Sequence, residues 1–331
     1  MQAADATHGM THMAFAEVKK FRFGADVQAS DGVAGRLECV VAGPAHHMLI
    51  AAGIRPHLFG KTHFIPLHLV AAGTAQVVTL TIPLAELEQR PTTPNAEGVI
   101  LSRSTHVAAA RGSLGQLVQL TVHGATHTLR HLVVARLGRE VLVPAPTIDA
   151  ITARQIAINL GSLSPGQLIA YRDDADLRQD ALDAIYDYWP LRVDMPGFEV
   201  HAIDGVIWLR GHVATDLNRR LVADQLVGIP GLAEVHNDLI ADTDLAAAVS
   251  MALAHDPRTA GERIGVYPRL GALSLRGNVR SGGLRQAAFQ VAAAVPGVKE
   301  IVNELRINPQ DPGLPDLAAV TNQEDMVPGG T

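Results

Sequence analysis

Short runs of alternating apolar and polar residues fill the first half of the chain, and this alternation predicts β-strands. Glycine, proline, aspartate and asparagine separate the runs, as expected for turns. The first set of runs comprises "GRLECVV", "HMLIAAGI", "HFIPLHLV" and "VVTLTI", and the second comprises "GQLVQLTV", "LRHLVVA", "EVLVPAPTI" and "IAINL". Many short strands joined by such turns are typical of small barrels or sandwiches.

From about residue 173 the pattern changes to helix, strand, strand, helix, strand. An apolar helical face precedes Pro190, and its members are Leu177, Ala181, Leu182 and Ile185. Asp204-Gly205 separates "FEVHAI" from "VIWLRG" and predicts a two-residue hairpin, because both turn positions need positive φ. The second helix begins after Thr215, a good N-cap residue, and ends at Pro230-Gly231. The run "LAEVHNDLI" predicts the last strand.

Both halves of the chain repeat internally. Residues 205–239 align with residues 271–305 at a constant offset of 66, so that Leu209-Arg210-Gly211 falls on Leu275-Arg276-Gly277. The first half repeats more faintly at an offset near 80, where "DGVAGRLECVV" corresponds to "RGSLGQLVQLTV". Periods of this length mark repeated folding units, so we expect four units of two kinds.

The later repeat carries a family resemblance. A strand ending in Leu-Arg-Gly-x-Val, a helix, Pro-Gly-Leu/Val and then Glu-Val/Ile-x-Asn-x-Leu resembles the BON domain of bacterial osmotic-stress and envelope proteins. The resemblance holds twice and covers about residues 173–307. It implies a small α/β module with two helices against a three-stranded sheet, which contacts phospholipid or another macromolecule and performs no catalysis.

The earlier repeat resembles the PRC-barrel. The motifs that carry this likeness are "DGVAGRLECVV", "FIPLHLV" and "LTIPLAELEQRP", with "GSLGQLVQL" and "VLVPAPTI" in the second copy, over about residues 22–170. The PRC-barrel is a compact β-barrel that docks onto proteins or ribonucleoprotein in its known relatives. Asp31 stands before the first glycine in one copy, whereas Arg111 takes that place in the other, so the resemblance does not imply a shared ligand site.

We therefore predict a multidomain chain of two small all-β PRC-type barrels and two small α/β BON modules of αββαβ order. The predicted boundaries are a flexible N-terminus at 1–20, barrels at 21–92 and 97–172, BON modules at 173–242 and 243–308, and a disordered acidic tail at 309–331.

The Arg-Gly pair at the end of the repeated strand suggests a structural role more than a role in a reaction or ligand site. Gly211 and Gly277 are expected to allow a turn or a close backbone approach that a side chain would block. Gly231 and Gly297, in the Pro-Gly helix stops, are predicted to be structural as well. The arginines of these pairs could bind phosphate, or they could be solvated or paired within the molecule.

Charge distinguishes the two BON-like copies. Residues 171–245 carry 6 basic and 15 acidic side chains, a net charge of −9, whereas residues 246–307 carry 8 and 4, a net charge of +4. The second copy is thus the candidate for an anionic surface, through Arg263, Arg269, Arg276, Arg280 and Arg285. These arginines could instead pair with the acidic first copy, within one chain or between chains.

Aromatic residues in the first copy form another candidate. Tyr186 and Trp189, with Tyr188 between them, could lie at a headgroup interface, which favours amphipathic rings. Alternatively, the rings could close the junction before Pro190.

Motifs for catalysis and cofactor binding are missing from the sequence. There is no Gly-x-Ser-x-Gly, no Walker loop and no dinucleotide fingerprint before a helix, so we predict a protein without enzymatic activity or cofactor. His123, His127 and His131 lie four apart, but Gly124 and the alternating pattern indicate a strand, which does not align all three for a metal. His57, His63 and His68 are spaced loosely, so we predict no metal site and interpret the histidines as surface residues.

Composition suggests the compartment and the class of partner. Cys39 is the single cysteine and lies in an apolar strand, no apolar run reaches 18 residues, and the N-terminus lacks a secretory pattern. We expect a cytoplasmic protein, peripheral at the inner membrane. The net charge of −6 and the lack of a basic run argue against nucleic acid.

These observations predict a binding or scaffold protein. We expect the barrels to dock a protein partner and the BON modules to contact anionic phospholipid or to self-assemble into a homo-oligomer. The alternatives are an adaptor in ribosomal or RNA assembly and an enzyme that uses the histidines to hold a metal.

Overall fold

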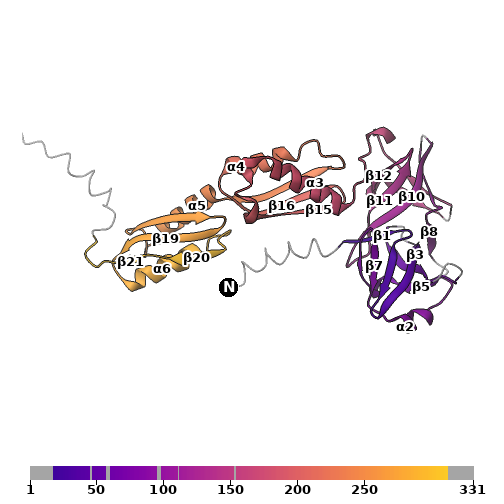
Figure 1. Cartoon of the computed structure of the whole chain (residues 1–331), viewed down its shortest axis with the longest axis horizontal. Coiled ribbons are helices and arrows are strands. Elements are labelled where there is room, and N and C mark those ends of the chain that lie inside the picture. Colours follow the sequence, from indigo (N-terminus) through magenta and orange to yellow (C-terminus); the bar gives the residue numbers. More distant parts are fainter. Residues whose placement is uncertain are drawn as a thin grey trace, which may run out of the picture. The chain divides into compact units, whose positions relative to one another are not determined.

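The computed structural model of the chain describes residues 18–44, 47–56, 60–94, 98–110, 112–152 and 154–311 (Figure 1). They form two compact units. The first unit runs to Leu177 and also includes Ala202–Val206 and Pro230–Ala233. The second contains Arg178–His201, Ile207–Ile229 and the residues from Glu234 onward. Most of the expected tails, at 1–20 and 309–331, lie outside the described residues, although residues 18–20 belong to a strand.

The first unit is built from two sheets of seven strands each. In the first sheet six strands run in the order β5-β4-β3-β2-β7-β6, and in the second they run in the corresponding order β12-β11-β10-β9-β14-β13. The first repeat consists of β1 (Val18–Arg22), β2 (Asp26–Ala29), β3 (Gly32–Ala42), β4 (Leu49–Arg55), β5 (His63–Pro66), η1 (Leu67–Leu69), β6 (Val70–Gly73), β7 (Val77–Leu80) and α2 (Leu84–Glu88). The second consists of β8 (Val99–Ser102), β9 (His106–Ala109), β10 (Gly112–His123), β11 (Leu129–Arg136), β12 (Arg139–Pro144), η2 (Ala145–Thr147), β13 (Ile148–Ile151), β14 (Gln155–Ile158) and η3 (Pro165–Gln167).

The seventh strand of each sheet comes from the other repeat. β1 opens the first repeat but pairs antiparallel with β10 of the second, from Val18 opposite His123 to Arg22 opposite Gln119. β8 opens the second repeat and pairs antiparallel with β3 of the first. The two repeats thus exchange their first strands, and neither completes its sheet alone.

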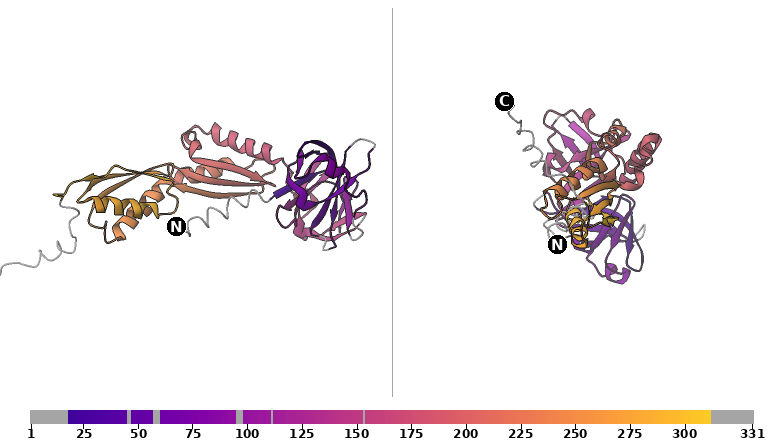
Figure 2. Two further views of the ribbon diagram at one scale, coloured as in Figure 1. Left: turned by 90° about the horizontal axis from the view of Figure 1, so that it is seen from below. Right: turned by 90° about the vertical axis from the view of Figure 1, so that its left-hand side faces the viewer.

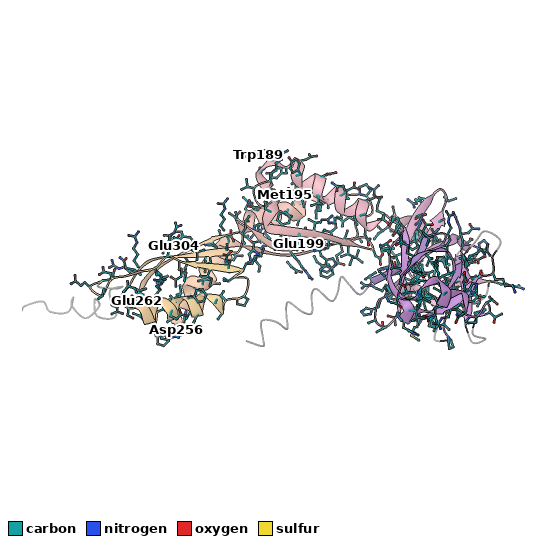
Figure 3. The ribbon with its side chains drawn as sticks, turned by 60° about the horizontal axis from the view of Figure 1, so that its bottom comes forward. Trp189, Met195, Glu199, Asp256, Glu262 and Glu304 are labelled. Atoms are coloured by element: carbon teal, nitrogen blue, oxygen red, sulfur yellow. The ribbon has the colours of Figure 1, made fainter. Side chains whose placement is uncertain are left out.

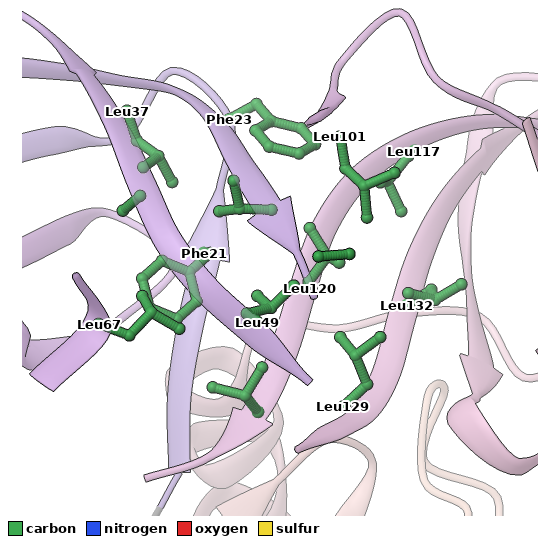
Figure 4. Packing of buried hydrophobic residues seen from close by; sticks show 14 of the residues in the cluster. Phe21, Phe23, Leu37, Leu49, Leu67, Leu101, Leu117, Leu120, Leu129 and Leu132 are labelled. Carbon is green, nitrogen blue, oxygen red and sulfur yellow. The ribbon is translucent and has the colours of Figure 1, made fainter. Parts of the chain in front are cut away.

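One apolar core spans both repeats. The buried cluster joins Phe21, Leu37 and Leu49 to side chains of the second repeat such as Leu117 and Leu120 (Figure 4). β3 and β10 depart from the predicted alternation, because residues 39–42 of β3 and residues 117–122 of β10 are buried without interruption, on both faces of each strand. The N-terminal region is therefore all-β, but its two sheets share a core.

The remaining elements make two modules of the same order. The first consists of α3 (Asp174–Asp187), η4 (Trp189–Leu191), η5 (Met195–Gly197), β15 (Phe198–Ile203), β16 (Val206–Val213), α4 (Asp216–Gln225) and β17 (Glu234–Ala241). The second consists of α5 (Asp242–His255), β18 (Arg263–Arg269), β19 (Ala272–Val279), α6 (Gly282–Ala293), β20 (Glu300–Asn303) and β21 (Arg306–Ile307). The hydroxyl of Thr215 accepts a hydrogen bond from Asn218 N, so the predicted N-cap is confirmed, and the hydroxyl of Ser281 caps α6 in the same way by accepting from Leu284 N.

Each module has a short sheet with helices on one side (Figure 2). The sheets have the orders β15-β16-β17 and β18-β19-β20, and β21 also pairs with β19. In the second module, apolar residues of α5 and α6 pack on Leu273, Leu275 and Val279 of β19. The intervening residues of each central strand face away from the helices, so one face of each sheet is left open. None of the helices among the described residues is long and apolar enough to cross a bilayer.

Candidate functional site

The repeated Arg-Gly pair lies on the central strand of each sheet, where this strand closely approaches the start of the preceding strand of its hairpin. Gly211 and Gly277 have φ values of +120° and +130°. A Cβ atom at Gly211 would lie 2.4 Å from the carbonyl oxygen of Gly197, and one at Gly277 would lie 2.1 Å from that of Arg263. Both the dihedral angle and the close backbone contact therefore favour glycine, so the glycine of each Arg-Gly pair has a structural role.

The two arginines that precede these glycines are held in equivalent ways. Arg210 Nε lies 3.7 Å from Asp238 Oδ2, and its guanidinium lies 5.5 Å from the ring centre of Trp208. Arg276 Nε lies 2.6 Å from Glu304 Oε2, and its guanidinium lies 5.4 Å from the ring centre of Tyr267. Each arginine is thus paired within its own module with a carboxylate and an aromatic ring, which was one of the two alternatives.

The glycines of the Pro-Gly stops also adopt positive φ. The values are +87° at Gly231 and +94° at Gly297. A Cβ at Gly231 would lie 2.3 Å from Arg172 Cγ, and one at Gly297 would lie 2.9 Å from Ile240 Cδ1. A larger residue would be strained at both sites.

The five candidate arginines of the second module fall into different environments. Arg276 pairs with Glu304, and Arg280 Nη2 lies 2.7 Å from Oε1 of the buried Glu262. Arg285 is exposed on α6. Arg263 and Arg269 are exposed on β18, and no acidic side chain pairs with either of them within the described part of the chain. The structure therefore separates two unpaired arginines on an open face from two that already have acidic partners.

Arg263 and Arg269 share their face of β18 with Tyr267, whose side chain is 55% exposed. At one end of this face, a shallow hollow of about 410 Å³ is lined by Arg263, Tyr267 and Arg276 together with Glu262. Because it is open to solvent, the hollow suits a charged group presented by a surface better than an enclosed small molecule.

The open face of the first module has the opposite charge. Three exposed carboxylates, those of Glu199, Glu234 and Asp238, lie on its outer strands. Between them Trp208 stacks on His236, with ring centres 3.9 Å apart and an interplanar angle of 15°. The only sequence signal for these residues is the repeat register, which aligns Trp208 and His236 with the paired positions Ser274 and Val302 on one face of the second module.

The aromatic candidates of the first module lie on its surface. Trp189 is 73% exposed at the outer edge of the module (Figure 3), and Tyr186 is 52% exposed. The guanidinium of Arg192 lies 4.2 Å from the ring centre of Tyr186, and its Nε donates a hydrogen bond to the carbonyl oxygen of Tyr186.

The histidines that could act as metal ligands do not lie together. His123 ends β10, His127 lies in the following turn with φ of 57°, and His131 lies on β11. Within the described ranges, no three side chains of histidine, cysteine, aspartate or glutamate gather as a metal site would require. His57 lies outside those ranges. Cys39 is buried, and burial together with the nearby Glu38 raises the pKa of its thiol to about 11, so the thiol is protonated at neutral pH.

The first unit contains a buried charge cluster of Lys20, Asp174 and Asp204 that could not be predicted from the sequence. Lys20 of β1 places its Nζ 2.6 Å from Asp174 Oδ2 and 3.2 Å from Asp204 Oδ1. Asp204 also accepts a hydrogen bond from the Thr121 hydroxyl, and its other oxygen lies 3.1 Å from His131 Nδ1. Burial opposes the charged amine, but the two aspartates outweigh this effect and raise the pKa of Lys20. The cluster therefore keeps its charges through mutual compensation.

Within the second unit, the two modules join through buried polar contacts. Asp242 accepts hydrogen bonds from the backbone amides of Leu270 and Gly271. The buried His212 lies against Gly271, and its Nε2 donates to the carbonyl oxygen of Gly297 at 2.6 Å. Lys299 Nζ donates to the carbonyl oxygen of Gly197. His212 Nδ1 is buried and has no hydrogen-bond partner among the described residues.

This joint is expected to weaken at acidic pH. Burial and the nearby Lys299 lower the pKa of His212, against the opposing effects of the Gly297 carbonyl and Asp242. The unfolded chain, with a histidine pKa near 6.5, then binds more protons than the folded chain, so the free energy of unfolding falls as the pH drops below about 6.5. Urea unfolding of the intact protein at pH 7 and pH 5, followed by tryptophan fluorescence, measures the loss.

The matched variant is His212→Gln, which keeps an amide donor for Gly297 but cannot be protonated. It should lose less stability than the wild type between the two pH values. Equal losses in both proteins would show that His212 does not contribute.

Comparison with known proteins identifies the repeated modules. The sequence model of the BON domain matches residues 173–240 and again residues 241–309. Residues 173–309 are therefore tandem BON domains, as the Leu-Arg-Gly and Pro-Gly motifs predicted. Among curated proteins, none matches the sequence.

Two solved structures of CdsD, a structural protein of the type III secretion system of Chlamydia trachomatis, are similar to parts of this chain. The C-terminal domain of CdsD is 17% identical, and the match covers 41% of this chain and 66% of that chain, slightly under two thirds, with a TM-score of 0.34. A second CdsD structure is 13% identical over 46% of this chain and 100% of that chain, with a TM-score of 0.22.

Proposed function

We propose that this chain, whose residues 173–309 form two BON domains, is a non-enzymatic binding or scaffold protein that contacts anionic phospholipid through its second BON domain. BON domains are known to bind phospholipid. The observation that carries the proposal is the open face of β18, where Arg263 and Arg269 flank the exposed ring of Tyr267. Each arginine near an anionic leaflet contributes about 1 kcal/mol, and tyrosine is favoured at the headgroup level.

The rest of the chain supplies the scaffold in this proposal. The all-β first unit resembles PRC-barrels in its motifs, and we assign it the docking of a protein partner. The protein would act in the cytoplasm at the inner membrane surface, a placement supported by its single, buried, protonated cysteine.

Co-sedimentation with vesicles tests the lipid contact. The intact protein is mixed with phosphatidylcholine vesicles containing increasing amounts of phosphatidylglycerol, at low and high salt. We expect binding that rises with the anionic lipid and falls with salt. The Arg263→Glu/Arg269→Glu variant should bind at least about 30-fold more weakly, because two contributions of about 1 kcal/mol are lost.

Two controls separate the β18 face from charge in general. Arg103→Glu/Arg130→Glu changes the net charge equally but alters exposed arginines of the first unit, and Arg285→Glu alters the helical side of the same BON domain. Both should bind nearly as well as the wild type. Equal weakening in all three variants would refute the assignment of lipid binding to the β18 face. Salt-sensitive binding of RNA without binding of vesicles would refute the lipid contact and favour the RNA adaptor.

A further inference from the structure

The two BON domains present open sheet faces of opposite charge. We define the acidic face, on the first domain, by its three carboxylates, its one arginine and its stacked rings: Glu199, Glu234, Asp238, Arg210, Trp208 and His236. We define the basic face, on the second domain, by its four arginines, its two glutamates and its exposed apolar side chains: Arg263, Arg269, Arg276, Arg306, Glu300, Glu304, Tyr267 and Val302. Glu199 and Glu304, one from each face, are labelled in Figure 3.

The residues of each face lie in rows across its sheet. On the basic face Tyr267 pairs with Ser274, which pairs with Val302, and Gly265 pairs with Arg276 in the adjacent row. Tyr267 and Val302 are 55% and 47% exposed, so this face also offers apolar area. On the acidic face, the stacked Trp208 and His236 provide a flat aromatic surface between carboxylates. Such faces can stack about 10 Å apart, as in a β-sandwich, if their charges are compatible.

The joint between the two BON domains of one chain involves neither of these faces. β17 ends at Ala241 and α5 begins at Asp242, so no linker separates the domains. The joint through Asp242, His212 and Lys299 uses the turns at Leu270-Gly271, Gly297 and Gly197, none of which belongs to either face. Each face is thus left to bind something outside its own pair of domains.

We propose that the acidic face of one chain binds the basic face of a second copy of the chain. The pairing brings carboxylates such as Glu199 and Glu234 opposite Arg263 and Arg269, which have no acidic partner in the described part of their own chain. It also covers Tyr267 and Val302 with the Trp208-His236 stack. Because each chain has one face of each kind, the contact is heterologous, and chains join head to tail into rings or open filaments.

This assembly involves the same arginines as the proposed lipid contact but does not depend on it. The test of self-assembly contains no lipid, so its result can be distinguished from the result of the vesicle-binding experiment. Sedimentation velocity of the intact protein at increasing concentration and low salt should show species larger than a monomer. These should dissociate at high salt, because the attraction is between exposed charges.

Charge reversal on either face provides the decisive comparison. Arg263→Glu/Arg269→Glu makes both faces acidic, and Glu199→Arg/Glu234→Arg makes both faces basic. Each variant alone should associate at least about 30-fold more weakly than the wild type, since like charges then oppose each other. An equimolar mixture of the two variants should assemble again, because every face then has a partner of opposite charge. The control Arg103→Glu/Arg130→Glu should assemble like the wild type.

The mixing experiment shows whether a variant lost assembly only because it misfolded, since an unfolded variant could not assemble with the other variant. The proposal is overturned if the wild type stays monomeric at low salt, which would make the acidic stretch 312–331 of the same chain the next candidate to cover the basic face. It is also overturned if either variant alone assembles as the wild type does, or if the mixture remains monomeric.

Discussion

Replacing Lys20 with methionine is expected to lower the free energy of unfolding of the first unit by about 3–5 kcal/mol. Lys20 is 5% exposed and compensates the carboxylates of Asp174 and Asp204 at 2.6 and 3.2 Å. Methionine fills similar volume but leaves two aspartates in a buried site without their cation. Since Trp189 and Trp208 both lie in the second unit, amide hydrogen exchange along β1, β10 and β11 is the appropriate measurement.

An exposed ion pair supplies the control for this substitution. Arg36 Nε lies 3.5 Å from Asp26 Oδ1, with both side chains more than half exposed, so Arg36→Met should cost no more than about 1 kcal/mol. The triple variant Lys20→Met/Asp174→Asn/Asp204→Asn removes the uncompensated charges and should recover part of the loss. If Lys20→Met costs no more than Arg36→Met, the buried cluster does not stabilise the fold.

Gly211→Ala is expected to destabilise the first BON domain by roughly 3–5 kcal/mol, the sum of backbone strain and steric overlap. The new Cβ would lie 2.4 Å from the carbonyl oxygen of Gly197 at a φ of +120°. The carbonyl belongs to the backbone, so relief requires separation of the strands. Urea unfolding followed by the fluorescence of Trp189 and Trp208, both in this domain, measures the effect.

Gly228 is a matched control in the same domain. It also has positive φ, +91°, but no atom lies within 4 Å of the Cβ that alanine would add. Gly228→Ala should therefore cost only the backbone term, about 1–2 kcal/mol. Similar losses for the two variants would mean that dihedral strain alone, and not the close strand approach, explains the glycine of the Arg-Gly pair.

Local and periodic features of the fold could be predicted from the sequence. The hairpin at Asp204-Gly205 is confirmed, with φ values of 49° and 83°, because a two-residue turn between two strands depends on the residues of the turn itself. The cap at Thr215 is confirmed for the same reason. The offset of 66 indicated two equal modules, since it preserves strand, helix and turn positions together.

Features that depend on contacts between distant segments could not be predicted in this way. Nothing in the run Val18–Arg22 indicates that it pairs with β10 and not with its own repeat. Lys20 has the appearance of a solvated residue in that run, and its partners Asp174 and Asp204 lie over 150 residues away along the chain. The same limit applies to Arg280, because its pairing with Glu262 depends on the β18-β19 register.

The exchange of β1 and β8 has a consequence for how the chain is made. The partner of Val18 is His123, so β1 leaves the ribosome about a hundred residues before its place in a sheet exists. At synthesis rates of 5–20 residues per second, this strand waits roughly 5–20 s, while the edge of β3 stays open until β8 emerges. The first repeat therefore cannot mature during its own translation. A premature stop before β10 would leave both repeats unfinished, and the nascent chain would have unpaired strands on which chaperones can act.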